Sequence, residues 1–169
     1  YKNVYGKEDT LVTIQIDMLL AERFGMYYTD ENGEKKLPYI IHRTSLGCYE
    51  RTLAYLIEHY AGALPTWMAP EQVRFLPVTD RAVDYCKEQA AKLTAQGYRV
   101  TVDTRSEKIG KKIRDAQMEK IPYMLVVGDR DIEAGTVSPR HRADGDLGAM
   151  TLEAFTAVLK DVVDNKLKK

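Results

Sequence analysis

Two side chains near each other in the sequence have types that can do chemistry: His42, which ends an apolar run, and Arg51, which follows a glycine turn. A neutral imidazole can bind a metal ion or transfer a proton near neutral pH. A guanidinium is a permanent cation that binds phosphates. Spacing alone favours plain structural roles for both side chains over acid/base or phosphate chemistry, with Arg51 paired to Glu50 or to a neighbouring carboxylate. One histidine also cannot form a catalytic zinc site, which usually has three protein ligands.

Strands are predicted before this pair. The β-branched, alternating run 10–17 predicts a strand that carries Gln15 and Asp17 on its polar face, where a sheet can present groups to a ligand. Plain exposure to solvent explains that polar face equally well. Segments 26–29 and 37–41 predict an antiparallel hairpin, because the Asn-Gly dipeptide between them accepts positive φ at both positions. The second of these strands leads directly to His42.

A helix is predicted after the pair, over about 47–59. Gly62 and Pro65 are typical of a helix end, and the Pro-bracketed segment 65–70 predicts a domain boundary. We therefore expect one domain at 1–69 and another at 70–169. The helix's apolar face is formed by Leu46, Leu53, Leu56, Ile57 and Tyr60.

The second domain alternates strands and helices. Ser106 is predicted to cap a helix that runs through Lys120, and the last helix starts at Thr151. The pattern predicts a mixed sheet covered by helices, so the fold class is α/β (α+β), with a partial antiparallel sheet in the first domain. The predicted elements are strand 72–78, helix 79–97, strand 98–103, helix 106–120, strand 122–127, a hairpin of 130–134 and 136–142 about Gly135, and helix 151–162.

A local group of basic side chains lies in the second domain and is opposed only by Glu107. It can meet phosphates, although a solvated helix face is the favoured explanation on charge alone. We expect Lys112 on an outer face of its helix and His141 at the surface of a polar hairpin. The basic residues are Arg105, Lys108, Lys111, Lys112 and Arg114.

The composition excludes several classes of protein. Formal net charge is zero, so total charge indicates no partner. Cys48 and Cys86 are far apart and there is no secretory signal, which fits a reducing cytoplasm better than a disulfide framework. No apolar run approaches the roughly 20 residues that span a bilayer, so we expect no membrane association. Phosphate-binding loops, dinucleotide fingerprints and paired-cysteine zinc motifs are lacking as well.

Several segments together resemble the C-terminal part of bacterial threonyl-tRNA synthetase, a class II enzyme. The resemblance covers nearly the whole chain from about Leu11, and the Ile-His-Arg and Glu-His-Tyr-Ala-Gly elements favour threonine over the related prolyl, histidyl and glycyl enzymes. The matching segments are 13–17, 41–43, 46–47, 50–51, 56–62 and 65–70 around motif 3, and 107–114 and 121–129 in the anticodon-binding domain.

The resemblance implies roles for residues of the first domain. His42 matches one of three zinc ligands, in a family where Zn²⁺ holds the amino and hydroxyl groups of threonine. Arg51 matches the motif 3 arginine that binds ATP phosphates, and Gln15 matches a residue facing the active site. The implied cofactors are Zn²⁺, ATP and Mg²⁺. The implied partners are threonine, ATP and tRNA(Thr) in a homodimeric, cytoplasmic parent enzyme.

The resemblance also implies an anticodon-contacting set in the second domain. Ser106 and Asp131 depart from the family, which has Asn and Glu there, and Cys48 stands where Ser is expected. Motif 1, the motif 2 arginine and two zinc ligands are not in this sequence, so we expect no threonyl-adenylate formation by this chain alone. A non-catalytic RNA-binding module and an inactive fragment remain alternatives. The implied anticodon-binding residues are Ser106, Lys108, Arg114, Asp131 and Arg140.

Overall fold

The computed structural model describes residues 1–45 and 47–167, and these form two compact units, Tyr1–His59 and Tyr60–Lys169. Leu46, which the sequence places on the apolar side of a helix, lies outside the described residues. The boundary between these units lies after His59, earlier in the sequence than the domain boundary predicted at Pro70. The two domains at 1–69 and 70–169 stay a prediction. Among the described residues, no helix is long and apolar enough to cross a membrane.

The first unit is built on a two-stranded antiparallel ladder. β1 (Ile14–Asp17) pairs with β4 (Ile40–Arg43), with Gln15 opposite His42. The predicted hairpin is correct at its tip, where β2 (Tyr28–Thr29) pairs with β3 (Lys35–Lys36). Its second strand was predicted wrongly, because Pro38, which has no N–H to donate, separates β3 from β4. β4 therefore pairs with β1 and brings His42 beside that strand.

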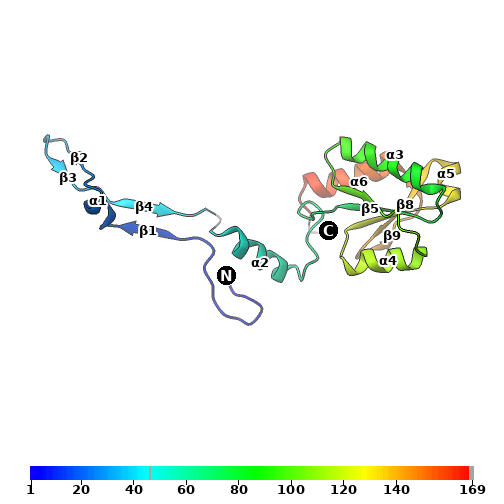
Figure 1. Cartoon of the computed structure of the whole chain (residues 1–169), viewed down its shortest axis with the longest axis horizontal. Coiled ribbons are helices and arrows are strands. Elements are labelled where there is room, and N and C mark those ends of the chain that lie inside the picture. Colours follow the sequence, from blue (N-terminus) through cyan, green and yellow to red (C-terminus); the bar gives the residue numbers. More distant parts are fainter. Residues whose placement is uncertain (46, 168–169) are drawn as a thin grey trace. The chain divides into compact units, whose positions relative to one another are not determined.

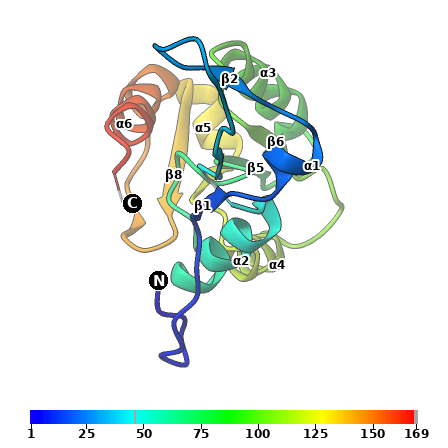
Figure 2. The ribbon, with the colours of Figure 1, turned by 90° about the vertical axis from the view of Figure 1, so that its left-hand side faces the viewer.

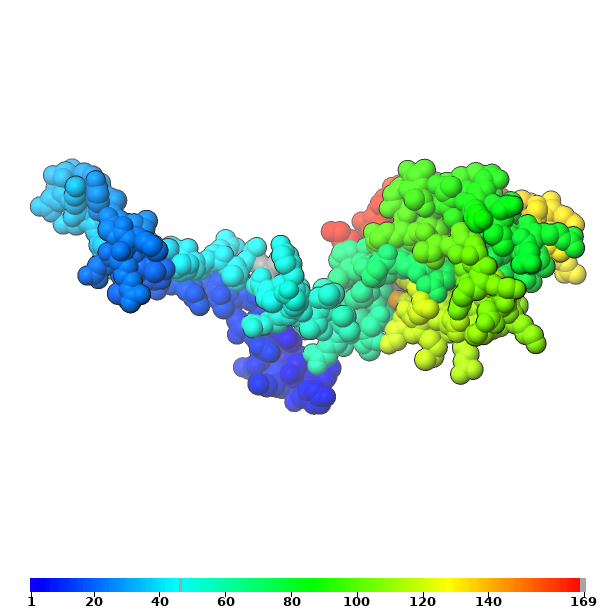
Figure 3. Space-filling view, viewed as in Figure 1, coloured from blue at the N-terminus to red at the C-terminus, as the bar shows by residue number. Residues whose placement is uncertain are grey.

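Much of the apolar surface of the first unit is open. Ile14 is 67% exposed, and Ile16 and Ile41 are each 66% exposed. The helices of this unit are α1 (Leu20–Arg23) and α2 (Tyr49–His59), and α2 has no buried residue. Figure 3 shows the atoms of this unit, in blue and cyan, as a narrow body. Strand order and helix placement, rather than a closed core, define this unit.

The second unit has a mixed sheet in the order β10-β8-β7-β5-β6, with β9 paired to β8. β5, β6 and β7 are parallel, and β8 is antiparallel to β7. This confirms the predicted fold class. The strands are β5 (Val73–Pro77), β6 (Val100–Val102), β7 (Tyr123–Val127), β8 (Thr136–His141), β9 (Gly145–Asp146) and β10 (Met150–Thr151).

Helices cover both faces of this sheet, and each face has its own core. α3 (Ala82–Ala95) and α6 (Leu152–Asp164) bury Cys86 and Phe155 against alternate residues of β5 and β7 such as Phe75. α4 (Ile109–Met118) packs Ala116 against Leu76 and Met124 on the other face. Figures 1 and 2 show α3 and α6 on one side of the strands and α4 on the other. This alternation is what right-handed crossovers between parallel strands produce.

One predicted strand of the second unit is a helix. The expected hairpin of 130–134 and 136–142 is wrong in its first half, because Asp129–Ala134 forms α5 and only Thr136–His141 is a strand. The Asp131 carboxylate accepts a hydrogen bond from the Gly128 N–H at 2.9 Å and closes the first turn. Gly135 ends the helix at φ 66°, where a side chain would be strained.

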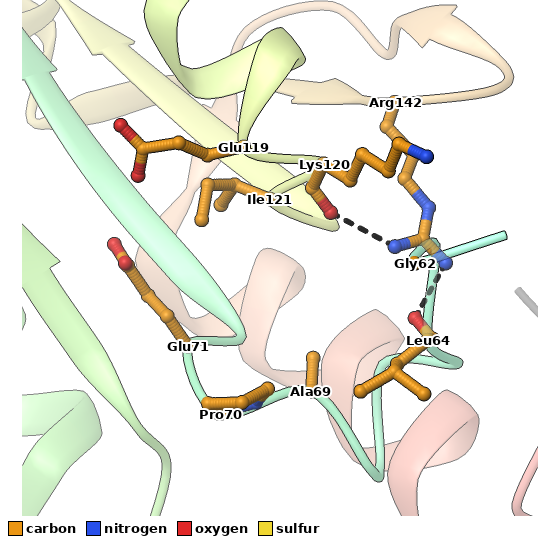
Figure 4. A pocket seen from close by; sticks show the side chains of 9 residues that line it. All are labelled: Gly62, Leu64, Ala69, Pro70, Glu71, Glu119, Lys120, Ile121 and Arg142. Carbon is orange, nitrogen blue, oxygen red and sulfur yellow. Dashed lines mark hydrogen bonds between the residues drawn. The ribbon is translucent and has the colours of Figure 1, made fainter. Parts of the chain in front are cut away.

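The segment that enters the second unit is fastened by two arginines. Arg142 donates to the carbonyl oxygens of Ala63 at 3.0 Å and Leu64 at 2.6 Å, and Arg99 donates to Ala69 O at 2.8 Å. Arg142 also donates to Lys120 O, and Figure 4 shows it reaching over the pocket that this segment borders. Desolvation lowers the pKa of Arg142. These carbonyl contacts explain why residues 60–69 belong to the second unit.

Candidate nucleic-acid interface and first-unit site

Three polar side chains share one face of the β1–β4 ladder. Gln15 and His42 lie directly opposite each other, and Asp17 follows two positions along the same face of β1. His42 Nε2 lies 3.3 Å from the Asp17 carboxylate. These residues line one shallow pocket together with Ile16, Met18 and Leu19. The ladder therefore brings together two of the predicted site residues and adds Asp17.

The Asp17 carboxylate has a second, local task. It accepts hydrogen bonds from the N–H groups of Leu20 and Leu19, both at 2.9 Å, at the start of α1. These backbone donors, first that of Leu20, and then the hydrogen bond with His42, lower the pKa of Asp17. A carboxylate that stays ionised beside a histidine can fix the orientation of that ring.

Arg51 lies on α2, and its Nη1 donates to the carbonyl oxygen of Thr10 at 3.1 Å. Its side chain is exposed. Near the start of the same helix, the Cys48 thiol donates to the Glu50 carboxylate at 2.7 Å and lowers the pKa of Glu50. The interpretation of Arg51 as a partner of Glu50 has no support in these contacts.

The residues present supply only some of the ligands that a metal site needs. Among the described residues, no group of three or more His, Cys, Asp or Glu side chains is placed to hold a metal ion. His42 with Asp17 gives one imidazole and one carboxylate, fewer than the three protein ligands of a catalytic zinc site. Further ligands would have to come from outside this chain.

A polar pocket in the second unit contains two of the predicted anticodon residues, Ser106 and Lys108. It lies past the ends of β5 and β6, and Lys108 is the residue that precedes α4. The remaining residues around the pocket combine hydroxyl, carboxylate and cationic groups. The pocket is lined by Pro77, Val78, Thr79, Asp80, Arg105, Ser106, Glu107, Lys108 and Lys112.

Lys112 corrects the expectation that it lies on an outer helix face. Its side chain is only 4% exposed, and its ammonium group donates to the carbonyl oxygens of Pro77 and Asp103, each at 3.1 Å. The helical spacing contained a signal for this position, because Lys112 falls on the inward stripe with Ile109, Ile113 and Ala116. Its charge had directed the prediction outward.

Asp131 and Arg140 lie on neighbouring elements, α5 and β8. Asp131 accepts a hydrogen bond from the Ser138 hydroxyl at 2.8 Å, and Ser138 shares one face of β8 with Arg140. Arg140 is half-buried, and its Nε has no hydrogen-bond partner among the residues that the structure describes. A buried, unpaired guanidinium N–H is costly, so this donor is suited to a ligand.

The other two side chains of interest differ in exposure. Arg114 is exposed on α4, as the sequence predicts. His141 is not the surface residue that was expected, because it is 3% exposed and points to the α3–α6 face of the sheet with Val137. Its Nδ1 lies 3.0 Å from the Asp144 carboxylate, and its ring lies 4.9 Å from that of Tyr123. The strand alternation of β8 accounts for this burial.

Two family models match the two units. The anticodon binding domain model matches residues 72–162, more than half of the chain, and the model of the tRNA synthetase class II core domain (G, H, P, S and T) matches residues 1–60. The chain therefore belongs to the anticodon-binding-domain family, and residues 1–60 are similar to the class II synthetase core.

The curated relatives that the chain resembles are threonine–tRNA ligases. The chain is 61% identical over 155 residues to a threonine–tRNA ligase of Clostridium perfringens (strain SM101 / Type A), covering 92% of this chain and 24% of the relative. It is 55% identical over 165 residues to that of Clostridium botulinum (strain Eklund 17B / Type B), covering 98% and 26%. The chain thus spans about a quarter of these relatives' length.

A solved structure agrees with both comparisons. The crystal structure of the RNA binding domain of threonyl-tRNA synthetase from Cryptosporidium parvum Iowa II superimposes with a TM-score of 0.79 at 32% identity, covering 95% of this chain and 41% of that one. The resemblance found in the sequence is confirmed at the level of family and fold.

Proposed function

We propose that this chain is part of an enzyme that ligates threonine to tRNA(Thr), and that its second unit holds the anticodon. The observation that carries the proposal is Arg140, whose buried Nε is unpaired among the described residues and whose strand also carries the partner of Asp131. Single-stranded RNA is read by stacking on planar side chains and by hydrogen bonds to splayed bases. A half-buried guanidinium with a free donor can supply both.

The other residues of the predicted set would act in different ways. Ser106 and Lys108 line one polar pocket and offer a hydroxyl and an ammonium group. Arg114 projects from the exposed side of α4, where a cation would neutralise a backbone phosphate. Asp131 holds the start of α5 and orients Ser138, so its part in anticodon recognition would be indirect.

For the first unit we propose a contribution to an active site completed by residues outside this chain. His42 would hold one position on Zn²⁺, with Asp17 orienting its ring. A bound zinc ion would supply coordination of the amino and hydroxyl groups of threonine. Arg51 would bind the phosphates of ATP·Mg²⁺ and Gln15 would line the same site. The parent enzyme would be a homodimer in the cytoplasm. The two free thiols of this chain fit that reducing compartment.

Binding of tRNA by the chain tests the proposed function. We expect affinity for tRNA(Thr) that falls with salt, because phosphate contacts release counterions. Arg140→Ala should weaken binding by about ten-fold or more and reduce the preference for the threonine anticodon, whereas Arg114→Ala should weaken binding to all tRNAs and reduce the salt slope by about one. Fluorescence anisotropy with tRNA(Thr) and a transcript of unrelated anticodon measures both effects.

The matched control is Lys160→Ala. Lys160 is an exposed cation on α6, paired with Asp164, and α6 covers the sheet face opposite α4. Lys160→Ala should leave the affinities for tRNA(Thr) and for the transcript of unrelated anticodon unchanged. Equal affinity of the unmodified chain for the two transcripts would remove the claim of recognition and leave only electrostatic attraction.

A further inference from the structure

A second pocket of the second unit lies at the amino ends of its parallel strands, opposite to the polar pocket past β5 and β6. It is bordered by residues just before β5 and β7, such as Glu71 and Ile121, and by Arg142, which follows β8. All of its lining residues belong to one compact unit. Its volume is about 180 Å³, below the roughly 300–1,000 Å³ of sites for drug-sized ligands, so it suits only a small molecule.

Opposite charges stand on opposite sides of this pocket. Figure 4 shows the carboxylates of Glu71 and Glu119 on one side and the cations Lys120 and Arg142 on the other. Both carboxylates bind one guanidinium, that of Arg74, at N···O distances of 2.6 Å. Two negative charges there meet one positive charge, so one negative charge remains. An ammonium group of a ligand would complement this side.

The two cations have no anionic partner within the described part of the chain. The Lys120 ammonium group donates to Ala61 O, and Arg142 donates to three backbone carbonyl oxygens. Arg142 is half-buried, and desolvation lowers its pKa. Because cations that lose solvent are normally paired with anions, a carboxylate of a ligand would complement this second side.

The backbone holds Lys120 in an unusual conformation. Its φ is 60°, in the left-handed region that favours glycine and is costly for a lysine. Its side chain lies along Gly62, where an added Cβ would be 3.4 Å from the lysine Nζ, so a larger residue there would crowd the ammonium group. Strained residues persist where surrounding contacts hold them, and they cluster at ligand sites. The Lys120 ammonium group is therefore held at the rim of the pocket.

Apolar side chains complete the lining of the pocket. Leu64 and Pro70 border it together with Ala69 and Ile121, which are 4% and 6% exposed. Such a surface favours contact with aliphatic groups of a ligand. The lining as a whole therefore matches a molecule with one ammonium group, one carboxylate and a short aliphatic body.

We propose that this pocket binds a small zwitterion of the amino-acid class, with its ammonium group at Glu71 and Glu119 and its carboxylate at Lys120 and Arg142. An α-amino acid and an amino acid with its amino group at the far end of the chain share this chemistry and differ in the spacing of the two charges. The inference goes beyond the proposed function, because the binding needs no RNA.

Titration of the whole chain with alanine, threonine and γ-aminobutyrate tests the proposal, with the amide NMR signals of Gly62 and Ile121 as the readout. Butylamine and butyrate have the length of γ-aminobutyrate and carry only one charge each. We expect saturable shifts with at least one zwitterion, and affinities about ten-fold or more lower for the two singly charged compounds. The order of affinities among the zwitterions identifies the preferred charge spacing.

Two variants each remove one charge from the pocket, Lys120→Gly and Glu119→Gln. Glycine adopts a φ of 60° without strain, and the Glu119 side chain is 55% exposed, so both variants should fold. Each should weaken zwitterion binding by about ten-fold or more. Lys166→Gly is the matched control, because Lys166 also has a left-handed backbone, with φ 49°, but does not line the pocket. Its affinity should equal that of the unmodified chain.

Three results would overturn the proposal. Butyrate or butylamine binding as tightly as the zwitterions would show that only one side of the pocket is used. Affinities unchanged in both variants would place the binding elsewhere. Absence of saturable shifts with every compound would leave the pocket a packing gap beside residues 60–69. No RNA is present in these titrations, so their result is independent of the proposed function, which tRNA binding tests separately.

Discussion

The Asp103 carboxylate is buried just after β6 and accepts hydrogen bonds from the Arg105 side chain. This pairing lowers the pKa of Asp103 from its ordinary value of 3.8, so the ionised form is favoured in the folded state. The stabilisation is present above the unfolded-state pKa and is lost as the pH falls through the folded-state pKa. We expect Asp103→Asn to lower the free energy of unfolding by about 2 kcal/mol at pH 7, and by less near pH ~3, below the unfolded-state pKa.

Urea unfolding at the two pH values measures this difference. Asp84→Asn is the control, because Asp84 is a 97% exposed carboxylate on α3 whose ion pair with Lys87 is long, at 3.7 Å. Its effect should stay within about 0.5 kcal/mol. A loss for Asp103→Asn that is the same at both pH values would show that its ionisation is not what stabilises the loop.

At the scale of single residues, position in the helical or strand pattern predicted burial better than residue type did. Lys112 and His141 are polar, yet both are buried because they fall on inward positions of a helix and a strand. Periodicity therefore outweighed polarity. The pairing of His42 with Asp17 was not predictable, because it depends on the register that places Gln15 opposite His42. The roles of Arg51 and Gln15 came from family resemblance and remain proposals.

α5 shows at the element scale why short segments mislead. Residues 130–134 contain an isoleucine flanked by charged residues, which fits one side of a strand as well as one turn of a helix. The deciding contacts are tertiary or turn-specific: Asp131 accepts from Gly128 N–H and from the Ser138 hydroxyl of β8. The longer elements α3, α4 and α6 were predictable because each presents several turns of regular apolar spacing.

The stability of α5 should depend on the half-buried Asp131 more than on the exposed side chains of the helix. We expect Asp131→Ala to lower the free energy of local opening by about 1 kcal/mol, because it removes the acceptor for the Gly128 N–H at the helix start. Hydrogen exchange of amides in 129–135 measures the opening. Glu133→Ala, at an exposed position of the same helix, should leave exchange nearly unchanged. Unaltered protection in Asp131→Ala would mean that β8 packing alone holds this helix.

At the scale of the whole molecule, the sequence distinguished a partial antiparallel sheet from a complete α/β layer structure. The second unit buries Phe75, Leu125 and Phe155 completely, whereas Ile14 and Ile41 of the first unit are exposed. Alternation and crossover order were enough to predict the second architecture. They could not predict that residues 60–69 pack with the second unit, because that depends on Arg99 and Arg142 bonding backbone carbonyl groups far away in sequence.

The two cysteines report separately on the two units. Cys48 is exposed in the first unit, whereas Cys86 is fully buried in the α3 core, where desolvation raises the pKa of its thiol to about 12. Thiolate is the reactive form, so we expect one thiol to react with a maleimide in seconds to minutes and the other only when the second unit opens. Mass spectrometry of the intact chain against time would give two separate phases.

The slow phase carries the information about the fold. Because Cys86 is packed with Phe75 and Leu93 in one core, its reaction should require global opening of the second unit and should accelerate with urea in parallel with the loss of helical circular dichroism. Cys48→Ser should remove the fast phase and leave the slow one unchanged, since the two cysteines belong to different compact units. Faster labelling of Cys86 in Cys48→Ser, or in urea too dilute to unfold the second unit, would contradict this expectation. The first unit would then be supporting the core of the second, and the two could not be treated as independent bodies.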